Sequence, residues 1–294
     1  DLFLNYGSPA VDPLAADYVS QSYLGRESLV VTRESRPPLR SGPYYVTVLD
    51  QIENETAGSF SIIASADGVP EQLLGPLAGL PLPEDGLERA LAATVQVITA
   101  AGGGSGSVIS PRGHIVTSWH VVRGYAGLPD PSPVVAVSID HAEPAEERFR
   151  ARVLRYSEER DLALLVVETG LYGRPLPSGF AMAHHSLGSS DDLAFGDGLW
   201  FIGYPDVGGT GSRPSVTLTR GVVSGFERSS FGVIIKSDGE INEGNSGGAA
   251  LDDEFRLVGL PTRVVGQDAG QLAYIHPLSA MPSSWWEIIA QAQD

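Results

Sequence analysis

A serine enclosed by small residues, within residues 243–248 (Glu-Gly-Asn-Ser-Gly-Gly), is the feature that most constrains this chain. Such a serine can sit on a tight turn with its hydroxyl exposed, because glycine neighbours let another backbone approach closely. Consecutive amides of the turn can point at one oxygen, as the charge that develops in acyl transfer requires. The same composition also occurs in ordinary loops, so Ser246 gains its meaning from the rest of the chain.

Two upstream segments supply the other groups that a serine nucleophile needs. Residues 104–122 predict a strand, a turn at residues 111–113, a second strand and a helical turn that carries His120. Residues 160–167 place Asp161 at the start of an apolar strand. The order histidine, aspartate, serine is one of the known orders of a catalytic triad, and it suits two consecutive small barrels with the site between them.

From about residue 93 onward the chain resembles the trypsin-fold serine proteases, and among them the protease domain of HtrA-type enzymes. The stretches that carry the resemblance are Gly-Ser-Gly-Ser-Val-Ile (104–109), Ile-Val-Thr-Ser-Trp-His-Val-Val (115–122), Asp-Leu-Ala-Leu-Leu (161–165), Phe-Ile-Gly-Tyr-Pro (201–205), Thr-Arg-Gly-Val-Val-Ser-Gly (219–225) and Glu-Gly-Asn-Ser-Gly-Gly-Ala-Ala-Leu (243–251). The resemblance implies two six-stranded β-barrels and a short C-terminal helix.

The resemblance also implies roles for individual residues. His120 would be the general base, Asp161 would fix its tautomer, and Ser246 would attack the scissile carbonyl. The oxyanion hole would comprise residues 244–246, with the amides of Gly244 and Ser246 as donors and Asn245 holding the turn. The implied reaction is peptide-bond hydrolysis through an acyl-enzyme, with a protein or peptide as substrate and no cofactor or metal required for catalysis.

The chain departs from the family pattern at three positions near these groups, one of which is Glu243, in place of a common proline near the nucleophile. Trp119 stands where the family usually has a small residue or asparagine, and a ring there would either crowd the base or shield it. Asn245 stands where digestive relatives carry aspartate, and an amide cannot form a buried ion pair with a freed N-terminus. Activation by N-terminal cleavage is therefore not implied.

The pocket for the substrate residue before the scissile bond is expected beside Leu260, Pro261 and Thr262, with Leu260 as an apolar wall. Glu240 lies near the usual base of that pocket. It is interpreted either as a solvated loop charge or as the counter-charge for a basic substrate side chain.

The first third of the chain predicts a separate β-sandwich from short strands rich in β-forming residues, at residues 1–8, 27–32, 42–49 and 58–64. It resembles the bacterial pre-peptidase C-terminal domain, a jelly-roll-like module of secreted peptidases. In that family further strands precede the first of these, so we expect an upstream segment or a strand-donating partner to complete the sandwich. Scattered acidic residues permit a calcium ion there without specifying one.

The predicted organisation is mainly β, in keeping with 35 glycines and 21 prolines. Residues 1–66 form the sandwich module, residues 67–89 a linker, and residues 90–294 the protease domain. A short helix is expected at residues 84–93, and the linker leucines are expected to dock on the protease.

Composition narrows the partners and the compartment. A net charge of −17 argues against nucleic acid and anionic membrane surfaces as partners. The chain has no cysteine, and no apolar stretch long enough to insert into a membrane is apparent. We expect a secreted protein, extracellular or periplasmic, that was processed from a longer precursor.

Two further hypotheses belong to other functional classes. The chain would alternatively be a structural or adhesive extracellular subunit whose protease fold is silent or latent, as Trp119 and the incomplete sandwich suggest. A carbohydrate-binding role for the sandwich rests on fold analogy alone.

Overall fold

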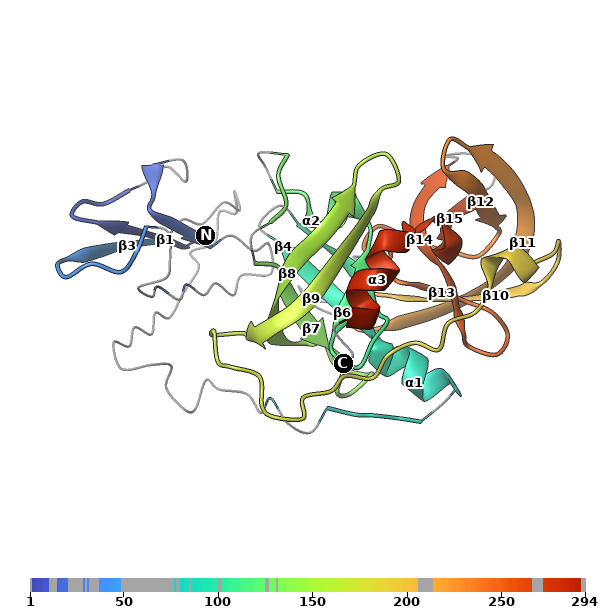
Figure 1. Cartoon of the computed structure of the whole chain (residues 1–294), viewed down its shortest axis with the longest axis horizontal. Coiled ribbons are helices and arrows are strands. Elements are labelled where there is room, and N and C mark those ends of the chain that lie inside the picture. Colours follow the sequence, from blue (N-terminus) through green and yellow to red (C-terminus); the bar gives the residue numbers. More distant parts are fainter. Residues whose placement is uncertain are drawn as a thin grey trace, which may run out of the picture. The chain divides into compact units, whose positions relative to one another are not determined.

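The computed structural model describes residues 2–10, 15–20, 29, 31, 37–48, 77, 80–84, 86–99, 102–124, 127–130, 132–205, 214–265 and 272–291. The chain divides into two compact units, Asp1–Pro76 and Leu77–Asp294. The division falls inside the predicted linker, and each unit has its own sheets (Figure 1).

The N-terminal unit contains a three-stranded antiparallel sheet in the order β2-β1-β3. Its strands are β1 (Leu2–Tyr6), β2 (Tyr18–Ser20) and β3 (Tyr44–Val48). Phe3, the second residue of β1, is fully buried. The Asp17 carboxylate accepts a hydrogen bond from the Tyr6 amide at 2.8 Å, which fixes the end of that strand.

Two of the strands predicted for this unit are therefore confirmed, as β1 and β3. Of the strand predicted at residues 27–32 the structure describes only Leu29 and Val31, neither of which is in a strand. The strand predicted at residues 58–64 lies outside the described residues. The second sheet of the sandwich, its completing strand and its calcium ion remain predictions.

The second unit begins at the linker leucines. Leu77 and Leu80 pack against the apolar core of the first barrel, as expected from the sequence. The predicted short helix is α1 (Gly86–Ala93), and it leads directly into the first barrel strand.

The first barrel is closed, with strand order β4-β5-β6-β9-β8-β7 (Figure 1). Its strands are β4 (Thr94–Thr99), β5 (Gly102–Val108), β6 (His114–Thr117), β7 (Val134–Val137), β8 (Glu146–Ser157) and β9 (Leu162–Gly170). Valines 95 and 97 fill its interior, and a side chain at Gly106 would meet Ile115 at 2.6 Å, so this glycine lets β5 lie close to its neighbours.

The second barrel is also closed, with strand order β10-β11-β12-β15-β14-β13. Its strands are β10 (Gly198–Gly203), β11 (Thr217–Ser229), β12 (Gly232–Ser237), β13 (Ala249–Leu251), β14 (Leu257–Val265) and β15 (Leu272–Pro277). The chain ends with the predicted helix, α3 (Ser283–Gln291). The expected mainly-β architecture with two six-stranded barrels is confirmed.

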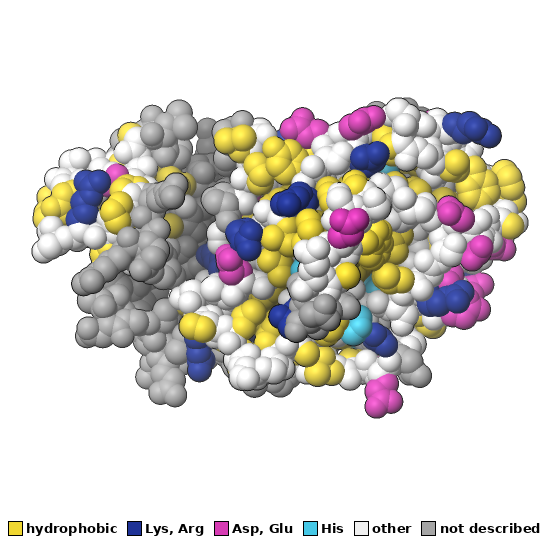
Figure 2. Space-filling view, viewed as in Figure 1, with side chains coloured by type: hydrophobic (Ala, Val, Ile, Leu, Met, Phe, Trp, Pro, Cys, Tyr) yellow, Lys and Arg dark blue, Asp and Glu magenta, His cyan; other side chains and the backbone are white. Residues whose placement is uncertain are grey.

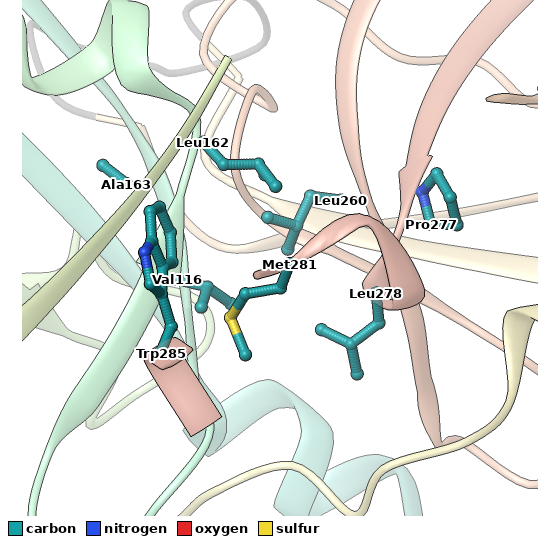
Figure 3. Close-up of a pocket in the computed structure, with 8 residues that line it drawn as sticks. All are labelled: Val116, Leu162, Ala163, Leu260, Pro277, Leu278, Met281 and Trp285. Atoms are coloured by element: carbon teal, nitrogen blue, oxygen red, sulfur yellow. The ribbon is translucent and has the colours of Figure 1, made fainter. Parts of the chain in front are cut away.

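Apolar side chains from both barrels and from α3 form one continuous core cluster. Within it lies a cavity of about 10 Å³, drawn in Figure 3. Its lining is Val116, Leu162, Ala163, Leu260, Pro277, Leu278, Met281 and Trp285. A space of this size holds at most one water, and the apolar lining offers that water no hydrogen-bond partner. The two barrels therefore contact each other here through apolar side chains.

His185 is buried beside this unit's first strand. Its Nε2 lies 3.3 Å from the Thr94 hydroxyl, and Arg89 on α1 binds the preceding carbonyl of His184 at 2.6 Å. Burial, together with the charges of Arg89 and His184, lowers the pKa of His185 from 6.5 to about 3.

The lowered pKa of His185 predicts acid destabilisation. In the unfolded chain His185 is protonated below pH 6.5, whereas in the folded chain it stays neutral until about pH 3. The stability that is present above pH 6.5 is therefore lost progressively as the pH falls from 6.5 to about 3. We expect a loss of about 2 kcal/mol at pH 5 from this residue. His185→Gln should flatten the pH dependence of the unfolding free energy measured in urea, and equal slopes for both proteins would contradict the prediction.

Candidate active site

The nucleophile loop connects β12 to β13 and carries Ser246. Gly244 and Gly247 have positive φ values of 93° and 79°. Glycine adopts such angles readily because it has no Cβ. Two tight turns follow, because Asn245 donates its amide to Asn242 O at 3.0 Å and Gly248 donates to Asn245 O at 3.0 Å. The turns leave Ser246 partly exposed.

His120 and Asp161 form a hydrogen-bonded pair at one end of the first barrel. His120 lies on the helical turn α2 (Trp119–Val122) that follows β6, as predicted. Its Nδ1 is 2.7 Å from Asp161 Oδ2, and its backbone amide donates to Asp161 Oδ1 at 2.9 Å. The two contacts fix the position of the ring and favour a proton on Nδ1, which leaves Nε2 as the basic nitrogen.

Asp161 directly precedes β9 and has a φ of +47°, a left-handed conformation that aspartate tolerates better than most residues. Its carbonyl accepts the amide of Trp119 at 3.1 Å, so the turn before β9 is tied to the start of α2. The unusual backbone geometry thus lies at the residue that orients the histidine.

Thr262 on β14 gives Asp161 a third hydrogen bond, from its hydroxyl to Oδ2 at 2.9 Å. Burial raises the pKa of Asp161, but the hydrogen bonds and charge of His120, together with the Thr262 hydroxyl, outweigh burial and hold that pKa below its ordinary value. The carboxylate therefore stays ionised at neutral pH.

The Ser246 hydroxyl completes a chain of contacts across the site. Its Oγ donates to the carbonyl of Thr262 at 3.1 Å, so Ser246, Thr262, Asp161 and His120 are linked in that order. Within the described part of the chain, His120 Nε2 has no hydrogen-bond partner. The serine thus lies at the site with its hydroxyl turned from the base, an arrangement common before substrate binds.

Two backbone amides of the nucleophile loop are available for an anion. The N–H groups of Gly244 and Ser246 donate no hydrogen bond to any residue that the structure describes. The amide of Asn245, by contrast, is used in its turn, and its side chain is buried. The oxyanion-hole roles expected of residues 244–246 stay a prediction.

The predicted substrate-binding residues fall in different places. Glu240 is exposed, and its carbonyl accepts the Thr219 hydroxyl at 2.7 Å, so both interpretations of its charge stay open. Pro261 accepts the Gly247 amide at 2.9 Å. Leu260, expected to be a pocket wall, instead lines the buried cavity in Figure 3. This placement corrects the expectation, because its side chain is enclosed by the core.

Trp119 does not crowd the base. Its ring packs in the core of the first barrel and stacks on Tyr156, with ring centroids 4.1 Å apart and planes 12° apart. His120 remains exposed on the other side of the helical turn. The contacts of Trp119 instead indicate support for α2, which is neither of the two roles, crowding or shielding, considered from the sequence.

Sequence reasoning missed two contributors. Thr262 was expected to border the substrate, and the role that the sequence did not indicate is the support that its hydroxyl gives to Asp161. Ser105, in the quoted Gly-Ser-Gly-Ser stretch, binds the nucleophile loop. Neither could be assigned from spacing, because each acts across more than one hundred residues of chain.

In the described residues, no group of three His, Asp or Glu side chains lies close enough together to hold a metal ion. The described helices are also too short or too polar to span a bilayer.

Two closed β-barrels, with a histidine–aspartate pair and a glycine-bounded serine brought together between them, define a trypsin-fold domain. A family model for the trypsin-like peptidase domain matches residues 104–260, just over half of the chain. The chain therefore belongs to the trypsin-like peptidase family.

Named relatives point to the HtrA-type branch. The chain is 32% identical over 172 residues to Protease Do-like 1, chloroplastic, of Arabidopsis thaliana, covering 55% of this chain and 33% of the relative. It is 31% identical over 175 residues to the periplasmic serine endoprotease DegP of Salmonella typhimurium, covering 58% and 31%. The chain thus spans about a third of the length of these two relatives.

A solved structure supports the same placement. The HtrA-type protease AlgW with tripeptide matches with a TM-score of 0.52 and 26% identity, covering 70% of this chain and 62% of that chain. The resemblance to HtrA-type proteases expected from the sequence is confirmed for the second unit.

The hydrogen bond from the Thr262 hydroxyl to Asp161 should contribute measurably to the free energy of unfolding. Thr262→Val keeps the shape but removes a hydrogen bond to a charged group, so we expect the unfolding free energy to fall by about 1–3 kcal/mol at pH 7. The pKa of Asp161 should rise for the same reason. Thr262→Ser keeps the hydroxyl and is the matched control. A valine variant as stable as the serine variant in urea unfolding would refute this role.

Proposed function

We propose that this chain is an exported serine endopeptidase that hydrolyses peptide bonds through an acyl-enzyme. The observation that carries the proposal is the linked set His120, Asp161, Thr262 and Ser246, which faces a loop with two uncommitted amides. Base, orienting acid, nucleophile and oxyanion donors are the parts that acyl transfer requires.

The reaction begins when the Ser246 hydroxyl turns from the Thr262 carbonyl to His120 Nε2. Oγ then attacks the substrate carbonyl while Nε2 takes its proton, and the oxygen that becomes negative lies at the amides of Gly244 and Ser246. The imidazolium is stabilised by Asp161 and gives its proton to the leaving amine. A water, deprotonated by His120, next attacks the acyl-enzyme and restores Ser246.

A protein or peptide is the proposed substrate. The AlgW structures that the fold matches are described with a tripeptide and with a decapeptide. Pro261, Thr262 and Glu240 are the residues proposed to border the substrate, with Glu240 open to a basic side chain. No cofactor is required in this mechanism, since each proton is held by a residue of the chain.

Export is proposed from the relatives, which include a periplasmic protease. Another relative is named chloroplastic, so the compartment itself stays open.

The surface argues against nucleic acid as a partner. On the face shown in Figure 2, basic and acidic side chains are interspersed among the described residues, without the gathered basic patch that nucleic acid requires. The net charge of −17 disfavours nucleic acid further.

A second candidate is a latent or silent protease fold in a structural or adhesive subunit. One observation favours it, the hydrogen bond from Ser246 Oγ to Thr262 O that keeps the hydroxyl from the base. In this view the site would react only after a ligand displaces that contact.

A fluorophosphonate probe tests the proposal directly. We expect the folded protein to be labelled and Ser246→Ala to remain unlabelled, with peptide turnover reduced on the order of 10⁶-fold. Labelling that appears only after a peptide is added would favour the latent protease. Folded protein that is never labelled would refute the proposed activity.

Asp161→Asn tests the orientation of the base. Asparagine tolerates the left-handed φ of residue 161, so the backbone should be kept. The amide favours the wrong tautomer of His120, and we expect kcat to fall by about 10⁴-fold. Steady-state peptide hydrolysis measures this, with circular dichroism as the control for folding. A loss smaller than tenfold would show that Asp161 does not orient the base.

A further inference from the structure

Ser105 on β5 is fully buried and uses each of its polar groups to hold other parts of the site. Its amide donates to Ser246 O at 2.9 Å, and its hydroxyl donates to Gly244 O at 2.7 Å. The hydroxyl also accepts the amide of Tyr204, which follows β10, at 2.8 Å. Its carbonyl accepts the Thr117 hydroxyl at 2.6 Å.

These contacts fall on the two residues whose amides are uncommitted. The carbonyls of Gly244 and Ser246 both point at Ser105, a residue of the other barrel. Each carbonyl shares a rigid peptide plane with the N–H of the following residue, so these two hydrogen bonds fix the planes that join residues 244–245 and 246–247. The plane that carries the Ser246 N–H lies between these two fixed planes, and the plane that carries the Gly244 N–H directly precedes the first of them. Anchoring both carbonyls therefore restricts the backbone dihedral angles that set the directions of these two N–H groups. The nucleophile loop is therefore oriented by the first barrel as well as by its own turns.

The surrounding glycines allow this close approach. A Cβ at Gly247 would lie 2.5 Å from the Ser105 carbonyl oxygen, and one at Gly248 would lie 3.1 Å from the Ser105 Cβ. A Cβ at Gly203 would lie 3.0 Å from the Ser105 hydroxyl. A side chain at Gly247 does not fit at that distance, and one at Gly203 or Gly248 would press on Ser105, so these glycines keep room for the contacts of Ser105.

We propose that Ser105 is a positioning residue, which sets the oxyanion-binding geometry of the nucleophile loop through Gly244 and Ser246. The inference rests on the proposed peptidase function for its catalytic consequence. Its structural consequence, an ordered loop at residues 243–248, is independent of any reaction.

Ser105→Ala removes the hydroxyl and leaves Gly244 O and the Tyr204 amide without their partner. A misplacement of about 1 Å in a reacting group costs roughly 100-fold, so we expect the rate constant of fluorophosphonate inactivation and kcat to fall by about 10- to 100-fold. KM should change by less than about threefold, because donors to a developing oxyanion act mainly in the transition state.

Ser107→Ala is the matched control. Ser107 lies two residues along the same strand and is equally buried, but its hydroxyl has no hydrogen-bond partner in the described structure. Removing it deletes the same atom without removing a contact to the loop. Its kcat should stay within about twofold of the natural chain, since no transition-state contact is lost.

Hydrogen exchange of the loop separates this inference from the proposed function. Mass spectrometry of a peptide that spans residues 243–248 should show faster exchange in Ser105→Ala than in Ser107→Ala, whether or not the protein hydrolyses peptides. Equal exchange in both variants would overturn the positioning role. A natural chain that never reacts with the probe, but whose loop loosens in Ser105→Ala, would refute the peptidase function alone.

A variant that keeps the volume guards against misfolding of the alanine protein. Ser105→Cys places a weaker hydrogen-bonding group at the same position. It should give inactivation rates and loop exchange between those of the natural chain and Ser105→Ala. A cysteine variant with the exchange of the natural chain and an alanine variant with the exchange of Ser107→Ala would together exclude the hydroxyl as the cause.

Discussion

The carboxylate of Asp161 is the group on which the rest of the site depends. It accepts two hydrogen bonds from His120 in the first barrel and one from Thr262 in the second. The carboxylate is partly buried, and a charge drawn partly out of water is stabilised by pairing and hydrogen bonds, so the barrels must meet with both donors in place. The cost of burying this charge is thus coupled to the assembly of the site.

Hydrophobic packing brings the barrels together, but it does not specify a site. The shared core, including Leu260 and Trp285, supplies non-directional stabilisation. Direction comes from hydrogen bonds between β5 and the nucleophile loop, and between Thr262 and Asp161. Glycines such as Gly247 are required where these hydrogen bonds demand backbone approach closer than any side chain permits.

Much of this arrangement follows from local signals in the sequence. The strands around His120, the strand after Asp161 and the glycine turn at Ser246 all follow from short-range rules on turns and periodicity. The direction in which each β14 side chain points does not follow from such local signals. Leu260 and Thr262 would share a face in a regular strand, yet the register with β15 shifts between Pro261 and Arg263. Because of this irregularity, Leu260 packs in the core while Thr262 hydrogen-bonds to Asp161. No local sequence pattern predicts the irregularity.

Local sequence patterns also fail to predict the strand β2 of the N-terminal unit and the rotamer of Ser246. The three-residue strand β2 is too short to produce a periodic signal, so pairing with β1 decides it. The Ser246 hydroxyl donates to the Thr262 carbonyl, and the proposed mechanism requires it to turn to the His120 ring. Both acceptors are placed by tertiary structure. Such choices depend on contacts among residues far apart in the chain.

Asn245 shows how the loop is held without a charge. It occupies the place where an aspartate would need a buried cationic partner, and its uncharged side chain is buried without one among the described residues. The backbone N–H of Asn245 donates to the Asn242 carbonyl in a turn. The loop is otherwise fastened by neutral groups, through Ser105 and the Pro261 carbonyl. Neutral hydrogen bonds do not depend on the ionisation of an α-amino group, whose pKa lies near 8. The conformation of the loop therefore depends on the packing of the two barrels. Thr262 links the loop to Asp161, because its carbonyl accepts the Ser246 hydroxyl while its own hydroxyl donates to the carboxylate.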